Sequence, residues 1–150
     1  MRNKWPFKQP MEAICRPGKT HKSPVEDCTC GIYGTIDFFE AADWLDWNKR
    51  NTHLELQTVI GLVKFWGNVI EYDSGFKAQY AYPSEIWIPP NSWYKAGTMK
   101  STERMAREIQ MAYGIPAQAI DDITEVTDYD RNLAGQHEVV NSEWLLGREC

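Results

Sequence analysis

The sequence predicts a single α+β domain, in which two helices flank a strongly curved antiparallel sheet. A barrel-like sheet is one form that this prediction allows. Two changes in hydrophobic period predict this class. Apolar residues recur every three to four positions after residues 37 and 101, as in helices, and every second position between 56 and 88, as in strands. A length of 150 residues fits one domain.

The first 36 residues show neither period and are rich in Pro, Gly, Lys and Cys. Such a segment buries too little apolar surface to order itself. Its folding therefore needs a further constraint, which its cysteines could supply. We therefore divide the chain into a stapled N-terminal segment, 1–36, and an α+β body, 37–150, within one domain.

The first helix is expected to begin at residue 37. Asp37 and Glu40 have the spacing of a capping box, in which two side chains satisfy free backbone N–H groups. Phe38, Ala41 and Leu45 then fall on one face, together with Ala42. The polar residues 48–52 should end the helix.

The sheet is expected to follow from residue 56. Both alternating sets of positions in 56–66 are mostly apolar, which predicts a strand covered on both faces. Gly67-Asn68 interrupts the pattern, and Asp73-Ser74-Gly75 predicts a turn in which Gly75 takes a positive φ. The second strand of this hairpin, 76–82, should have one buried face and one solvent-exposed face. Pro83 should end this strand before a short strand over 85–88.

A second helix is expected between Ser101, a suitable N-cap, and Gly114, a suitable C-terminal cap. Met105 and Ile109 lie on its apolar face with Ala112 and Tyr113. A last strand is predicted over 137–140.

Three of the four cysteines lie within sixteen residues of one another, with a histidine between them, in the pattern Cys15-x5-His21-x6-Cys28-x-Cys30. Three sulfur donors and one imidazole would satisfy a tetrahedral zinc ion. Metal binding folds a segment that lacks a core of its own. The sequence therefore predicts a structural Zn2+ that holds residues 1–36.

Other interpretations of the cluster stay open at this point, because the spacing matches no standard zinc finger. The cysteines could be buried free thiols or form a disulfide. They could also be catalytic, as a three-ligand zinc with an open position or as a nucleophilic Cys28 or Cys30 with His21 as base. Glu26 or Asp27 would then serve in proton transfer. Cys150 is expected to be free.

The charge distribution excludes one class of partner. Residues 1–36 have six bases and three acids, whereas residues 37–150 have ten bases and eighteen acids. An acidic body repels phosphates, so non-specific binding of duplex DNA is not expected. The basic N-terminal segment is interpreted as a solvated arm around the metal site.

An aromatic set in the predicted sheet forms a second candidate site. Seven tryptophans are present, and aromatic side chains on an open sheet face could stack bases or hold a cation. The alternative is that they fill the core. The candidate binding residues are Trp66, Tyr80, Tyr82 and Trp87, with Lys64 and Lys77 on neighbouring positions.

Other motifs are weak or missing. Asp128, Asp130 and Asn132 have the opening spacing of a calcium loop, but the glycine and the bidentate glutamate that such a loop needs are absent. His53 and His137 are isolated, and no common catalytic motif is present. The N-terminus lacks the apolar core of a signal peptide and no apolar run could span a bilayer, so we expect a cytoplasmic protein without a membrane partner.

Two segments resemble a set of small uncharacterised bacterial and phage-borne proteins. The first segment is His21-x2-Pro24-x3-Cys28-x-Cys30-Gly-Ile-Tyr, and the second is the Trp66-Gly-x-Val-x-Glu-x3-Gly-Phe-x-Ala-x-Tyr-Ala-Tyr-Pro83 hairpin. The resemblance covers about residues 15–90. It implies that the Cys/His cluster and the hairpin belong to one module, and it implies no activity or catalytic residue.

The leading functional hypothesis is a non-enzymatic zinc-binding regulatory or interaction module with a protein partner. An inhibitor of a host protein, of the phage type, is one form of this hypothesis. One alternative is a zinc- or thiol-dependent enzyme that uses the Cys/His cluster. The other is single-stranded nucleic acid or nucleotide binding on the aromatic sheet face.

Overall fold

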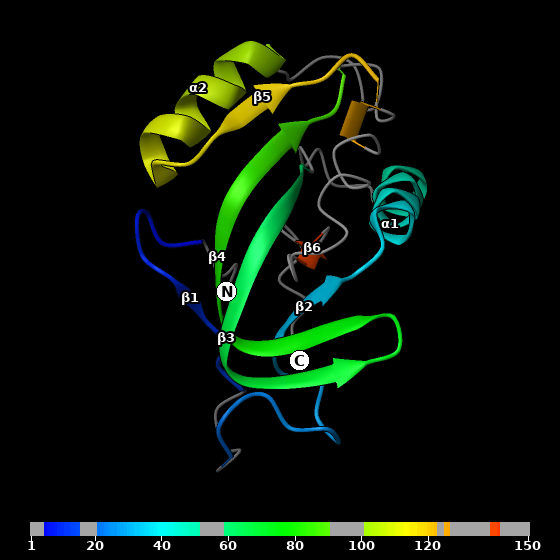
Figure 1. Ribbon diagram of the computed structural model, residues 1–150, viewed down its shortest axis with the longest axis vertical. Helices are drawn as coiled ribbons and strands as arrows, with labels where there is room; N and C mark the ends of the chain where they lie inside the picture. The colour runs from blue at the N-terminus through cyan, green and yellow to red at the C-terminus, as the bar shows by residue number, and fades with distance from the viewer. Residues whose placement is uncertain are drawn as a thin grey trace.

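The computed structural model of the protein describes residues 5–15, 21–51, 59–90, 101–122, 125–126 and 139–141. These residues form an α+β fold, as predicted (Figure 1). In chain order the elements are β1 (Met11–Glu12), β2 (Ile32–Thr35), α1 (Phe38–Asn51), β3 (Ile60–Tyr72), β4 (Gly75–Ile88), α2 (Thr102–Tyr113), β5 (Ala117–Ala119) and β6 (Val139–Asn141). In the ranges given, neither helix is long and apolar enough to cross a membrane.

The sheet is built around the long hairpin of β3 and β4. β4 also pairs with β1 and β2 in antiparallel fashion and with β5 in parallel fashion, and β6 pairs with β2 and β3. The N-terminal segment therefore contributes two strands that its sequence pattern does not indicate. Within the described residues, β2 and β6 pair at Thr35 and Val140 alone. The sheet is antiparallel around its central hairpin and strongly curved, as the sequence predicts, but it does not close into a barrel.

Two bulges bend the central hairpin. Gly67 and Asn68 together stand opposite Gln79, and Gly67 has a φ of 80°. The second bulge is at Ser84, where the register shifts by one residue. Bulges bend a strand and increase its twist without ending it. β3 therefore continues through Gly67-Asn68 and β4 continues through Pro83, although the sequence predicts breaks at both places.

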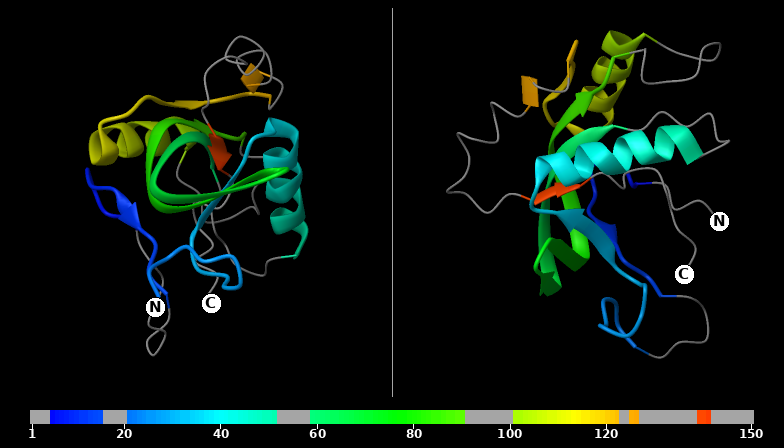
Figure 2. Two further views of the ribbon diagram at one scale, coloured as in Figure 1. Left: turned by 60° about the horizontal axis from the view of Figure 1, so that its bottom comes forward. Right: turned by 90° about the vertical axis from the view of Figure 1, so that its right-hand side faces the viewer.

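The two helices cover opposite faces of one end of the hairpin (Figure 2). Trp87 alternates with Ile86 and Ile88 along β4, so its side chain lies on the other face. One cluster joins α1 to the Trp87 face through Phe38, Ala41, Ile60, Leu62 and Trp87. The other cluster joins α2 to the Ile86 face through Met105, Ala106, Val59, Ile86 and Ile88. The prediction that this part of the sheet is covered on both faces is confirmed.

The helix ends follow the predicted capping in part. Ser101 Oγ accepts a hydrogen bond from the backbone N–H of Arg104, and Gly114 caps the C-terminus of α2 in the left-handed conformation. At α1, Asp37 Oδ1 accepts from the Phe39 N–H at 2.6 Å. Glu40 does not complete the capping box, because its Oε2 atom lies 2.7 Å from Thr35 Oγ1 at the end of β2. This contact joins the start of α1 to the sheet.

Gly75 lies where β4 approaches the backbone of β2 closely, and replacing it tests this packing. The sequence predicts a positive φ at Gly75, but its φ is not in the left-handed region. It is needed for close approach instead, because a Cβ atom at Gly75 would collide with the backbone oxygen of Gly34 on β2. We expect Gly75→Ala to lower the free energy of unfolding by about 1–3 kcal/mol, the usual cost of overpacking. Urea denaturation followed by circular dichroism measures this change. Ser74→Ala, an exposed change in the same turn, is the control and should have little effect.

Candidate metal centre

The four predicted metal ligands come from two short stretches on either side of 16–20. Cys15 follows β1, which pairs with β4, and a hydrogen bond from Ala13 N to Gln79 O extends this pairing toward Cys15. His21, Cys28 and Cys30 lie in the loop that leads into β2. Because β1 and β2 both pair with β4, the sheet brings the two stretches together.

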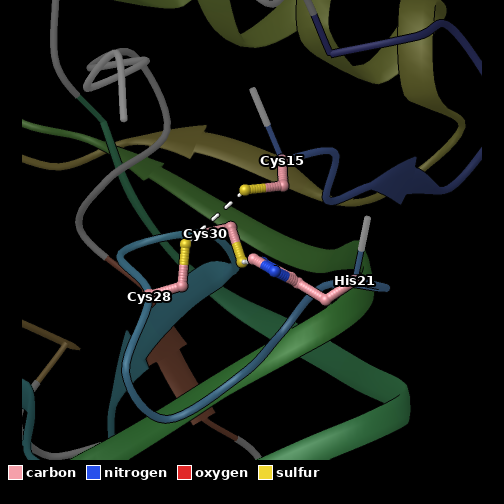
Figure 3. A group of neighbouring side chains, drawn as sticks. All are labelled: Cys15, His21, Cys28 and Cys30. Carbon is pink, nitrogen blue, oxygen red and sulfur yellow. Dashed lines mark hydrogen bonds between the residues drawn. The ribbon is translucent and has the colours of Figure 1, made fainter. Parts of the chain in front are cut away.

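The side chains of Cys15, His21, Cys28 and Cys30 point toward one another (Figure 3). Their four ligand atoms all lie within 4.8 Å of one another. Cys15 Sγ is 3.5 Å from Cys28 Sγ, and His21 Nε2 is 3.3 Å from Cys30 Sγ. In a tetrahedral zinc site the sulfur atoms are about 3.8 Å apart, and a sulfur and a nitrogen atom are about 3.6 Å apart. The cluster therefore has the size of a tetrahedral metal site.

The chemistry of the sulfur atoms also fits a metal. Cys15, Cys28 and Cys30 form no disulfide bond, and the 3.5 Å separation of the Cys15 and Cys28 sulfur atoms is well beyond the length of such a bond, about 2.05 Å. A hydrogen bond from the Cys30 backbone, aided by side-chain bonds from Cys15, Cys30 and His21, lowers the pKa of the Cys28 thiol from 9.0 to about 6, while desolvation opposes this shift. Thiolate is the form of cysteine that binds metal.

Lys77 of β4 holds the ligand loop from the sheet side. Its side chain is only 2% exposed. The Nζ atom donates to the carbonyl oxygens of Cys28 and, at 2.7 Å, of Val25, and it lies 5.6 Å from the centre of the Tyr33 ring. Val25 O also accepts from the Cys28 N–H, so Lys77 binds the turn that presents Cys28.

Gly31 allows the loop to close over Lys77. It has a φ of 139°, a conformation that favours glycine. A Cβ atom at this position would lie 2.5 Å from Lys77 Cγ and 3.3 Å from Pro24 Cβ. The glycine after Cys30 is thus needed both for its backbone conformation and for the space that the lysine stem occupies.

The lysine would also balance the charge of a divalent ion bound by three thiolates. Three thiolates exceed the charge of a divalent ion by one negative charge, and a buried excess charge is costly unless it is compensated. Lys77 supplies one positive charge next to the ligand loop. The sequence predicts Lys77 as a surface binding residue, and this is wrong because its ammonium group is buried among the loop carbonyls. Only the strand register, which pairs Lys77 with Tyr33 of β2, indicates its role.

The other predicted binding residues are divided between the core and a partly exposed face of the hairpin. Trp87 is 2% exposed and belongs to the core beneath α1. Tyr82 donates its hydroxyl to Tyr113 O at 2.6 Å. Trp66 stacks on Tyr80 with ring centres 6.0 Å apart. Lys64 is exposed and lies on the same face as Trp66, because side chains two positions apart in a strand share a face.

The Glu12 carboxylate lies beside the stacked pair of Trp66 and Tyr80. The Tyr80 hydroxyl donates to Glu12 Oε1 at 3.0 Å, and this bond raises the pKa of Tyr80. Glu26 and Asp27, the acids proposed for proton transfer, are both exposed. The remaining candidates, Asp128, Asp130, Asn132, His53, His137 and Cys150, lie outside the described residues.

Neither family models, curated proteins nor solved structures include a match to this chain.

Replacing Lys77 with methionine tests its role in the metal centre. Lys77→Met keeps most of the side-chain stem but removes the charge and the hydrogen bonds to Val25 O and Cys28 O. We expect metal affinity to fall about ten- to a hundredfold, the usual effect of losing a residue that supports metal ligands. Competition with a chromophoric zinc chelator measures this affinity.

Lys64→Met is the matched control, because Lys64 lies on the neighbouring strand and is exposed. Its zinc affinity should equal that of the wild type. Equal affinity in Lys77→Met and the wild type would contradict the role assigned to Lys77.

Proposed function

We propose that the protein is a small zinc-binding interaction module, in which a structural zinc ion fixes residues 1–36 on the sheet and the assembled surface binds a protein partner. The single observation that carries this proposal is the convergence of Cys15, His21, Cys28 and Cys30 within 4.8 Å. Three sulfur atoms and one imidazole favour zinc over magnesium or calcium, which prefer oxygen ligands.

A structural role is favoured over a catalytic one. A catalytic zinc keeps one coordination position open for water, whereas four protein ligands complete a tetrahedral shell. Lys77 gives further support, because it binds the ligand loop and offsets the excess charge of three thiolates. Glu26 and Asp27 are exposed, and within the described part of the chain neither forms a hydrogen bond to the four ligands.

A protein partner is favoured by the charge of the body. The net charge of 37–150 is acidic, with eighteen acids against ten bases, so phosphates are repelled. An inhibitor of a host protein, as phages encode, is one form of this proposal. That form rests on the resemblance to phage-borne proteins and on the net charge.

Metal analysis tests the proposal directly. We expect one zinc ion per chain after purification without added chelator, and a lower melting temperature after the ion is removed, because the energy of binding a structural metal contributes to folding. Cys30→Ser, which changes the buried ligand, should lose the metal and melt at the lower temperature. Cys150→Ser, which changes the cysteine outside the four-residue pattern, is the control. Zinc below half an ion per chain in the wild type would contradict the proposal.

Nucleic acid binding remains a second candidate because Trp66 is partly exposed, stacks on Tyr80 and shares a face with Lys64. The Glu12 carboxylate beside Tyr80 opposes it. We therefore expect oligo(dT) to leave tryptophan fluorescence unchanged at low salt, where phosphate binding is strongest. Quenching that salt weakens and Trp66→Phe abolishes would favour the nucleic acid function instead.

A further inference from the structure

The tip of the β3–β4 hairpin meets the start of α1, and both views in Figure 2 show the two side by side. Ile36 N donates to Ser74 O at 3.3 Å, and Thr35 pairs with Gly75. Thr35 Oγ1 lies 2.7 Å from Glu40 Oε2, which joins the first turn of α1 to this point. We name the surface formed by 36–44 and 69–76 the hairpin–helix corner.

Large apolar side chains are exposed at this corner. Phe39 is 62% exposed, Ile36 is 51% exposed and Tyr72 is 44% exposed. Tyr72 pairs with Gly75, and Gly75 pairs with Thr35, so Tyr72 and Thr35 lie on one face of the sheet with no side chain between them. The face that carries Tyr72 is therefore the face that the first turn of α1 approaches through Glu40.

The charges at the corner all have one sign. Residues 36–44 and 69–76 include no Lys or Arg, and they carry five exposed carboxylates, on Asp37, Glu40, Asp43, Glu71 and Asp73. Aromatic and apolar side chains that stand exposed among charges of one sign are typical of an interaction surface. The apolar groups supply binding energy, and the charges select and steer the partner.

We propose that the hairpin–helix corner binds a basic amphipathic segment of a partner protein, with apolar side chains against Phe39 and Tyr72 and with Lys or Arg beside the carboxylates. This rests on the proposed interaction function and names its surface and the chemistry of its partner. A second copy of this chain fits poorly, because five carboxylates would face five others across a symmetric interface. Nucleic acids and anionic lipids are repelled for the same reason.

A peptide-binding experiment tests this proposal. The probe is a labelled synthetic helix of about 18 residues made of Lys and Leu at amphipathic spacing, and its control has every Leu replaced by Ser. Fluorescence anisotropy is measured with the zinc-loaded protein. We expect the Lys/Leu peptide to bind and the Lys/Ser peptide to bind at least about tenfold more weakly, because the apolar contacts are lost.

Variants of the protein locate the binding site. Phe39→Ser combined with Tyr72→Ser should weaken binding of the Lys/Leu peptide by about tenfold or more. Met111→Ser, at an apolar position on α2 that is more exposed than either, should not. Asp43→Asn combined with Asp73→Asn should weaken binding and reduce its dependence on salt. Asp121→Asn combined with Asp122→Asn removes the same charge elsewhere and is the control. Zinc content and melting temperature are measured for every variant to show that each is folded.

Three results would overturn the proposal. Corner variants that bind the peptide as the wild type does would place the site elsewhere, and they would leave the interaction function intact. Absence of binding to the Lys/Leu peptide by zinc-loaded protein would exclude the basic amphipathic partner. A dimer in sedimentation experiments that Phe39→Ser with Tyr72→Ser dissociates would assign the corner to self-association. Failure of the structural zinc would appear separately, in the metal content.

Discussion

The convergence of three sulfur atoms and one imidazole is the constraint on which the rest of the N-terminal structure depends. Residues 1–36 supply two strands of only two and four residues, β1 and β2, and such short strands order a Pro- and Gly-rich segment weakly. A metal that binds Cys15 on one side and His21, Cys28 and Cys30 on the other would close the chain between them into a loop. Closing a loop limits the conformations of the unfolded chain and so favours the folded one.

The loop of the Cys/His cluster is joined to the bent hairpin through β4. Bulges at Gly67-Asn68 and Ser84 curl the sheet, and the curl lets one strand pair with β1, β2, β3 and β5 along its length. Lys77 extends from this strand into the ligand loop and binds the carbonyls of Val25 and Cys28. Near its end the same strand carries Trp87, which lies beneath α1. The ligand loop, α1 and the hairpin tip therefore all contact or belong to β4.

Local patterns in the sequence predict the helices, the four residues of the Cys/His cluster and the two-sided burial at the start of β3, because each depends on residue type and short-range spacing. The bulges could not be predicted in the same way. Gly67-Asn68 and Pro83 have the composition of breaks, yet pairing with the partner strand carries both strands through them. The buried position of Lys77 could not be predicted either, because a lysine in an alternating strand is expected on the solvent-exposed face. Its burial follows from the register between β2 and β4, a contact between residues far apart in the chain.

The central claim is that this protein alone supplies a complete shell of ligands to one zinc ion. X-ray absorption at the zinc edge of the purified protein tests that claim most directly, because it reports the atoms bound to the ion and their distances. We expect three sulfur atoms at about 2.3 Å and one nitrogen atom at about 2.0 Å from the ion. An oxygen atom in place of a sulfur or of the nitrogen would mean an open or water-bound site, and it would contradict a purely structural zinc.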